Sequence, residues 1–167
     1  IDLGIHHLAT LANGYKVESP KPYKRYQQKL KRTQRSFSRK KKGSANRKKQ
    51  QLDLQKLHAR ISNIRNECLH QLTDMVTKTW RVIGVEDLNV SGMLKNRCLA
   101  RSISDMGFYE FRRQLEYKGK RRGCTIVFAD RFFPSSKKCS TKGCDFIHKE
   151  LSLSAVSYTH LTLPTRS

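Results

Sequence analysis

A short apolar run that ends in two acids constrains this chain more than any other feature. Residues 82–85 read Val-Ile-Gly-Val, and Glu86 and Asp87 follow at once. Such a run is typical of a buried strand whose carboxylate emerges at the strand end. A second run of this kind, residues 1–5, contains Asp2. If the two strands are neighbours in one sheet, we expect the carboxylates of Asp2 and Glu86 to lie close together.

Strand geometry allows only one of the two acids, Glu86 or Asp87, to lie beside Asp2. Adjacent residues on a strand point to opposite faces, so Glu86 and Asp87 cannot both face the same site. We select Glu86, the first acid after the run, and expect Asp87 to act as a cap or turn former. Two converging carboxylates suit a divalent metal ion, so the pair predicts a metal site for phosphate chemistry.

The charge of the chain predicts an anionic partner. Its 167 residues include 35 Lys and Arg against 13 Asp and Glu, which gives a net charge of +22. Such an excess repels itself in a compact fold, and nucleic acid relieves it because bound phosphates release their counterions. No apolar run reaches the roughly 20 residues that cross a bilayer. Five cysteines, an odd number, favour a reducing compartment. We therefore expect a cytoplasmic protein with neither a membrane partner nor a small-molecule substrate.

The positive charge is concentrated in residues 21–49, which carry 14 Lys or Arg and no acid. Residues 43–46 interrupt this segment, and apolar residues then recur at spacings of three and four, which predicts a helix over about 47–79. We expect a basic helical hairpin over 20–80 after a β-hairpin over 1–19, and a phosphate backbone of RNA or an RNA–DNA hybrid as its partner. The predicted contacts are Lys24, Arg25, Lys29, Lys31, Arg32, Arg35, Arg39, Lys40, Lys41, Lys42, Arg47 and Lys48.

Residues 81–133 are predicted to form a strand, a helix and a second strand. The helix is expected to be capped by Ser104 or Asp105 and to run to about Lys118, which we expect to face outward. The second buried strand follows over residues 124–130. This order is typical of a parallel α/β unit.

Two later cysteines are candidate zinc ligands. Cys139 and Cys144 are separated by four residues, which is at the edge of the spacing found in zinc sites. His148 could serve as a third ligand. A four-ligand site needs a second pair, and no second Cys pair follows. Zinc is therefore possible, with an incomplete ligand set.

Taken together, these segments resemble the C-terminal half of a TnpB/OrfB-type protein of bacterial insertion sequences, a relative of the type V CRISPR effectors. Residues 1–4, Ile-Asp-Leu-Gly, resemble the first RuvC-like motif, and residues 84–88, Gly-Val-Glu-Asp-Leu, resemble the second. Residues 132–140 resemble the entry to the zinc ribbon of this family, and residues 105–118 resemble the helix before it. The resemblance covers residues 1–154.

The resemblance implies an α/β fold of the RNase H-like (RuvC-like) type. This fold has a mixed sheet, a long basic helical-hairpin insertion and, over residues 134–154, a zinc ribbon that is incomplete here. It also implies an RNA-guided DNA endonuclease that binds guide RNA and DNA and holds two Mg²⁺ ions with three acids. Asp2 and Glu86 match two of these acids, and the third is missing. Because one acid of the metal site is missing, we expect an inactive fragment. Residues 155–167 lack family character, so we expect them to be a foreign tail. The family is bacterial, which implies a nucleoid-associated location in the cytoplasm.

Two other functions fit parts of the pattern. A basic RNA-binding protein without catalysis would explain the charge and the helical hairpin, but it has no use for two converging acids. A transposase that transfers DNA strands would use the same fold and the same metal chemistry. The sequence does not separate this transposase from the nuclease.

Overall fold

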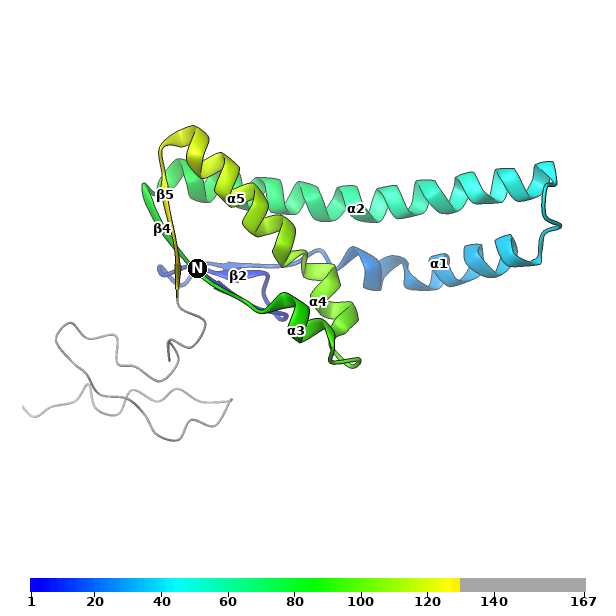
Figure 1. The fold of residues 1–167 in the computed structure, drawn as a ribbon, viewed down its shortest axis with the longest axis horizontal. Coiled ribbons are helices and arrows are strands. Elements are labelled where there is room, and N and C mark those ends of the chain that lie inside the picture. Colours follow the sequence, from blue (N-terminus) through cyan, green and yellow to red (C-terminus); the bar gives the residue numbers. More distant parts are fainter. Residues whose placement is uncertain (130–167) are drawn as a thin grey trace, which may run out of the picture. The chain divides into compact units, whose positions relative to one another are not determined.

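The computed structural model describes residues 1–129 (Figure 1). Within them lie five short strands and five helices, and no helix among these is long and apolar enough to cross a membrane. In chain order the elements are β1 (Asp2–Leu3), β2 (Ala9–Thr10), β3 (Lys16–Val17), α1 (Pro22–Arg39), α2 (Ala45–Thr79), β4 (Val82–Glu86), α3 (Val90–Leu94), α4 (Ala100–Met106), α5 (Phe108–Arg122) and β5 (Thr125–Ala129).

The first 17 residues contain three strands, where the sequence predicted a two-stranded hairpin. The chain reverses after β1, so that Asp2 lies opposite Thr10, and β2 then pairs with β3, also antiparallel. The predicted parallel pairing of β4 with β5 is confirmed. Strand β1 also lies beside β4, where the terminal amine of Ile1 donates to the carbonyl of Gly84 at 2.6 Å. The strands therefore form two sheets, a three-stranded antiparallel sheet in the order β1-β2-β3 and a two-stranded parallel sheet β4-β5, with β1 beside β4. Together with the helices they make a mixed α/β structure, in which the two sheets take the place of the single mixed sheet that we expected.

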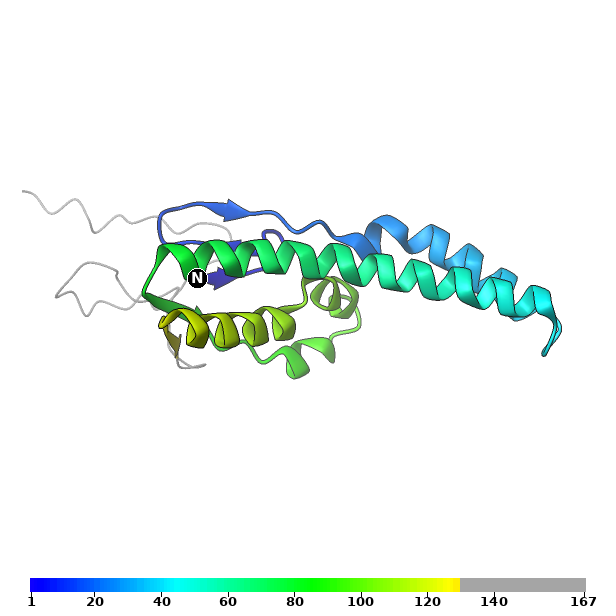
Figure 2. The ribbon, with the colours of Figure 1, turned by 90° about the horizontal axis from the view of Figure 1, so that it is seen from above.

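Successive side chains along a strand point to opposite faces, so the strands have one covered face and one exposed face. The covered face packs against α2, α4 and α5 (Figure 2). On the opposite face the side chain of Val82 is 66% exposed and that of Val127 is 49% exposed. The core consists of Leu3, Leu8, Ala9, Leu11, Leu69, Leu72, Val76, Ile83, Val85, Ile103, Met106, Phe108, Phe111 and Leu115.

Helices α1 and α2 form the predicted helical hairpin (Figures 1 and 2). Leu30 of α1 packs against Leu57 and Ile61 of α2 in a small core of its own. Beyond this contact α2 continues into the main core, so its apolar stripe serves two separate clusters. Ser44 begins α2, because its hydroxyl accepts a hydrogen bond from the backbone N–H of Arg47 at 3.2 Å.

The single helix predicted from Ser104 or Asp105 is in fact two helices. Gly107 has φ 70° and separates α4 from α5. A Cβ at this position would lie 2.9 Å from Cδ of Arg65, so a larger residue would strain the backbone and also require the Arg65 side chain to move. Asp105 therefore lies inside α4 instead of at the start of a helix. Lys118, which we expected to face outward, is only 5% exposed.

Candidate functional site

Asp2 and Glu86 lie on the exposed face of neighbouring strands. Asp2 is exposed and precedes the buried Leu3, while Glu86 is half-buried and follows the buried Val85. Both acids line one hollow of about 330 Å³ between β1, β4 and β5. Gly84 also lines this hollow, and a Cβ at Gly84 would contact no described residue within 4 Å. The fold thus brings the two predicted acids to one surface.

Asp87 has a different role from the cap or turn former that its position suggested. Its carboxylate accepts a hydrogen bond from Nη1 of Arg112 at 2.7 Å, and Arg112 also stacks on the ring of Phe128 with 3.9 Å to the ring centroid. The cap predicted for Asp87 belongs to Asn89, whose Oδ1 accepts from the N–H of Gly92 at 3.0 Å. Asp87 therefore ties β4 to α5 and β5.

The pair of acids has the donor chemistry that Mg²⁺ uses. Mg²⁺ binds hard oxygen atoms, commonly through one or two carboxylates plus waters and substrate phosphates. Across residues 1–129 no group of three or more His, Cys, Asp or Glu side chains could hold a metal ion. Asp2 and Glu86 therefore fit a two-carboxylate site and not a closed cage. The predicted zinc ligands Cys139 and Cys144 lie outside the described residues.

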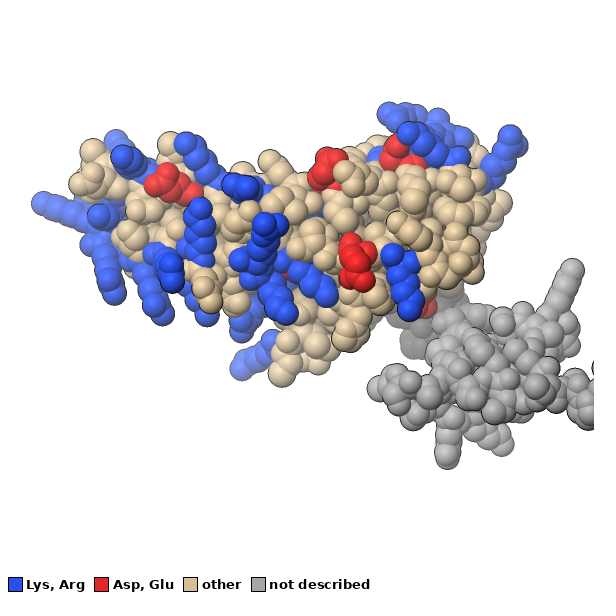
Figure 3. All heavy atoms as spheres, turned by 180° about the vertical axis from the view of Figure 1, so that it is seen from behind, with Lys and Arg blue, Asp and Glu red and all other residues tan. Residues whose placement is uncertain are grey.

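Eleven of the twelve predicted phosphate contacts are exposed on the helical hairpin, where Figure 3 shows Lys and Arg side chains projecting into solvent. In the described part of the chain, none of these eleven forms an ion pair with a carboxylate. Arg47 differs. Its guanidinium donates to the carbonyls of Phe37 and Lys40 at 3.1 and 3.0 Å and lies 4.1 Å from the centroid of the Phe37 ring. Arg47 therefore closes the tip of the hairpin.

Asp105 is a key residue of the hairpin that sequence reasoning assigned to the wrong helix. Its carboxylate is 3% exposed and accepts the backbone N–H groups of Tyr23 and Lys24 at 2.9 and 3.2 Å. The residue before α1, Lys21, has a left-handed φ of 41° and makes no side-chain cap. Helix α4 thus supplies the acceptor that the first turn of α1 requires. No local pattern could reveal a cap that lies 82 residues away.

A buried polar seam joins α2 to α5. The ammonium group of Lys118 donates to Oγ1 of Thr73 at 2.9 Å and to a backbone carbonyl of α2, and burial lowers the pKa of Lys118. One turn further along, Arg122 pairs with Asp74. Hydrogen bonds from Lys78 and Arg122 lower the pKa of Asp74 to about 2. The seam fixes α5, which leads into β5, against the long helix.

Comparison with known proteins identifies a family for most of the chain. Residues 1–97 match the family model OrfB_IS605, described as "Probable transposase". Residues 108–161 match the model "Cas12f1-like, TNB domain". Together these matches cover the strands, the basic hairpin and the helix α5 described above.

Two curated relatives extend over nearly all of the chain. A protein of Streptomyces pristinaespiralis, named "Putative RNA-guided DNA endonuclease", is 43% identical over 159 residues, which are 95% of this chain and 39% of that protein. "Putative RNA-guided DNA endonuclease InsQ" of Escherichia coli K12 is 39% identical over an alignment of 158 residues, which covers 86% of this chain and 39% of that protein. The chain thus spans about two fifths of the length of these relatives. Because the first family model matches more than half of its residues, the chain belongs to the OrfB_IS605 transposase family.

Proposed function

We propose that this chain forms the RNase H-like (RuvC-like) nuclease core of an RNA-guided DNA endonuclease. The observation that carries the proposal is the position of Asp2 and Glu86, which lie on neighbouring strands and line one hollow on the exposed face. The names of the two relatives support the same activity. The basic hairpin supports nucleic acid, DNA or guide RNA, as the partner, because its eleven exposed predicted contacts lack carboxylate partners among residues 1–129.

In the proposed site, Asp2 and Glu86 would hold Mg²⁺. Bound there, Mg²⁺ supplies Lewis-acid activation of water and charge stabilisation at the leaving oxygen of a phosphodiester. The protein contributes the placement of the two carboxylates. Asp2 is fixed opposite Thr10 by the pairing of β1 with β2, and Glu86 is fixed opposite Ala129 by the pairing of β4 with β5. Gly84 leaves room for a nucleic-acid backbone to approach both acids.

Metal binding by this chain tests the site directly. Mn²⁺ is a paramagnetic substitute for Mg²⁺, and electron paramagnetic resonance measures its free concentration during a titration. We expect the unmodified chain to bind Mn²⁺ and both Asp2→Asn and Glu86→Gln to lower the affinity by about tenfold, since each removes one charged oxygen ligand. Asp53→Asn is the matched control, because Asp53 is an exposed acid on α2. Equal Mn²⁺ binding by all four proteins would contradict the proposed site.

Strand transfer is a second candidate function, because the matching family is described as a transposase. It would use the same two acids, so metal binding does not separate it from hydrolysis. Product analysis in an intact relative does: hydrolysis leaves free DNA ends, whereas strand transfer joins them to a second DNA. A basic RNA-binding protein without catalysis is the remaining alternative. It predicts that nucleic acid binds normally while Asp2→Asn and Glu86→Gln change nothing.

A further inference from the structure

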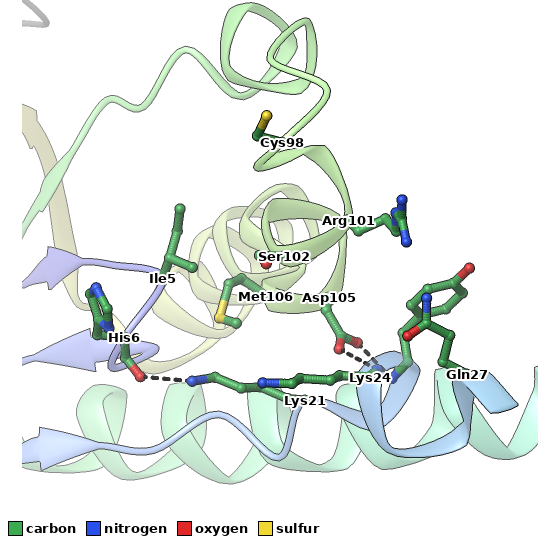
Figure 4. A pocket seen from close by; sticks show the side chains of 11 residues that line it. Ile5, His6, Lys21, Lys24, Gln27, Cys98, Arg101, Ser102, Asp105 and Met106 are labelled. Atoms are coloured by element: carbon green, nitrogen blue, oxygen red, sulfur yellow. Dashed lines mark hydrogen bonds between the residues drawn. The ribbon is translucent and has the colours of Figure 1, made fainter.

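A hollow of about 520 Å³ lies where the start of α1 meets α4 and the loop after β1, and we call it the junction cleft (Figure 4). It shares no lining residue with the hollow that contains Asp2 and Glu86. Its polar lining includes three cations and two neutral side chains that can donate hydrogen bonds. These residues are Lys21, Lys24, Arg101, Gln27 and Ser102.

The junction cleft has an excess of positive charge. Among the described residues Asp105 is the only carboxylate that lines it, against three cations, and both oxygens of Asp105 already accept backbone N–H groups of α1. The ammonium group of Lys21 is held at the rim by the carbonyl of His6 at 3.2 Å, as Figure 4 shows. Lys24 and Arg101 are exposed. Within residues 1–129 none of the three cations forms an ion pair, so an anion that enters the cleft would not have to displace a carboxylate from them.

A fourth cation borders the same region. A neighbouring hollow of about 280 Å³ shares Tyr23, Arg101 and Asp105 with the junction cleft and is also lined by Arg65. The Nε atom of Arg65 is buried and has no hydrogen-bond partner among the described residues. A buried donor without a partner is unfavourable, and Arg65 forms no ion pair within residues 1–129, so it adds positive charge beside the cleft.

We propose that the junction cleft binds a phosphate group of a nucleic-acid backbone, with Lys21, Lys24 and Arg101 as its charged contacts. The choice of nucleic acid as the source of the phosphate rests on the proposed function. It is favoured over a free anion because Lys24 also begins the row of exposed cations along α1, so that a backbone lying on the helix reaches the cleft. Contacts to phosphate set the position and register of a nucleic acid. The cleft would therefore fix the backbone where the hairpin joins the core.

The salt dependence of binding tests this contact. Lys24→Gln/Arg101→Gln removes two charges at the cleft, and Lys120→Gln/Arg121→Gln removes two exposed charges at the end of α5. The logarithm of the binding constant is measured against the logarithm of salt concentration for the full chain with duplex DNA. We expect the cleft variant to reduce the slope by about 0.9, since the variant loses its contact with one phosphate and each such contact contributes about 0.9. The matched control is expected to keep the slope of the unmodified chain. Equal reductions in both variants would show only the overall charge and overturn the proposal.

Cys98 provides a second measurement, because its exposed thiol lines the cleft. Its rate of alkylation by iodoacetamide is followed by peptide mass spectrometry, with the half-buried Cys124 as internal reference. We expect polynucleotide to slow the alkylation of Cys98 and leave Cys124 unchanged. Separate arms with single-stranded RNA, duplex DNA and RNA–DNA hybrid identify the source of the phosphate. Protection by inorganic phosphate but by no polynucleotide, or no protection at all, would overturn the proposal.

Failure of the cleft and failure of the nuclease site are distinguishable. The Mn²⁺ titration reports on Asp2 and Glu86, neither of which lines the junction cleft. The salt slope and the Cys98 measurement need no metal and no cleavage. An unchanged Mn²⁺ affinity in Lys24→Gln/Arg101→Gln confirms that this variant retains the fold of the core.

Discussion

Asp105 connects two segments of the chain through a single buried carboxylate. We expect Asp105→Ala to lower the free energy of unfolding by about 1–2 kcal/mol, because the N–H groups of Tyr23 and Lys24 lose their acceptor. Urea denaturation followed by circular dichroism measures the change. Ser104→Ala is the control, since Ser104 is exposed beside it on α4. An unchanged unfolding midpoint for Asp105→Ala would show that the first turn of α1 does not depend on this cap.

Gly107 makes a backbone conformation possible that other residues adopt with strain. We expect Gly107→Ala to destabilise the fold by about 1–2 kcal/mol, because its φ is 70° and the new Cβ would press on Cδ of Arg65. Thermal unfolding measures this effect. Gly84→Ala serves as the comparison, because a Cβ at Gly84 meets nothing within 4 Å. The prediction fails if the two alanine variants melt at the same temperature.

At the scale of elements, two ionised carboxylates stabilise the packing of α5: Asp74 joins α2 to α5, and Glu110 forms its hydrogen bonds within α5. Lys78 and Arg122 lower the pKa of Asp74 to about 2, and a hydrogen bond from Arg113 together with one from Gln114 lowers the pKa of Glu110 to about 2. A carboxylate with a depressed folded-state pKa stabilises the fold above its ordinary pKa, and this stabilisation disappears as the pH falls through the folded-state value. The seam is therefore a site of acid sensitivity.

We expect the stability of the chain to decrease as the pH falls from about 5 towards 2, in the range where these carboxylates become protonated. Urea midpoints at a series of pH values measure the decrease. Asp74→Asn should show a smaller decrease than the unmodified chain, because it removes one of the titrating groups. Asp53→Asn, on an exposed part of α2, should follow the unmodified chain. Parallel curves for all three proteins would exclude the contribution of Asp74.

The sequence predicted the elements whose patterns are long or strongly apolar. The periodicity before residue 79 and the apolar runs at β4 and β5 were sufficient for the helical hairpin and the parallel pair. The reversal between β1 and β2 was missed, because strands of two residues carry no periodicity. The burial of Lys118 and the cap from Asp105 were missed for another reason. Their partners lie on elements far away in the chain, so only the tertiary structure reveals them.

The candidate site was predictable to the extent that it depends on strand ends. Asp2 and Glu86 were chosen from apolar runs followed or interrupted by an acid, and the neighbouring strands β1 and β4 place them on one hollow. The junction cleft had no such signal. Lys21 and Arg101 are 80 positions apart, and each is an ordinary surface cation until α1 and α4 pack together.

For the whole molecule, we expect little or no cleavage of DNA. The family resemblance implies metal ions placed by three acids, and Asp2 and Glu86 match only two of them. Because metal placement determines the rate, the loss of one acid should remove most of it. Nicking of supercoiled plasmid in Mg²⁺ measures the activity. Nicking that requires Mg²⁺ and disappears in Asp2→Ala would show that two acids are enough.

The cap of α1 by α4 also has a consequence for biosynthesis. A ribosome adds about 5–20 residues per second, and Tyr23 and Asp105 are 82 positions apart. Roughly 4–16 seconds must therefore pass between the translation of the first turn of α1 and that of its acceptor at this elongation speed. During that interval the most cationic segment of the nascent polypeptide has left or is leaving the exit tunnel without its anchor. Helix α1 can therefore attach to α4 only after the chain as far as Asp105 has been translated and has left the ribosome.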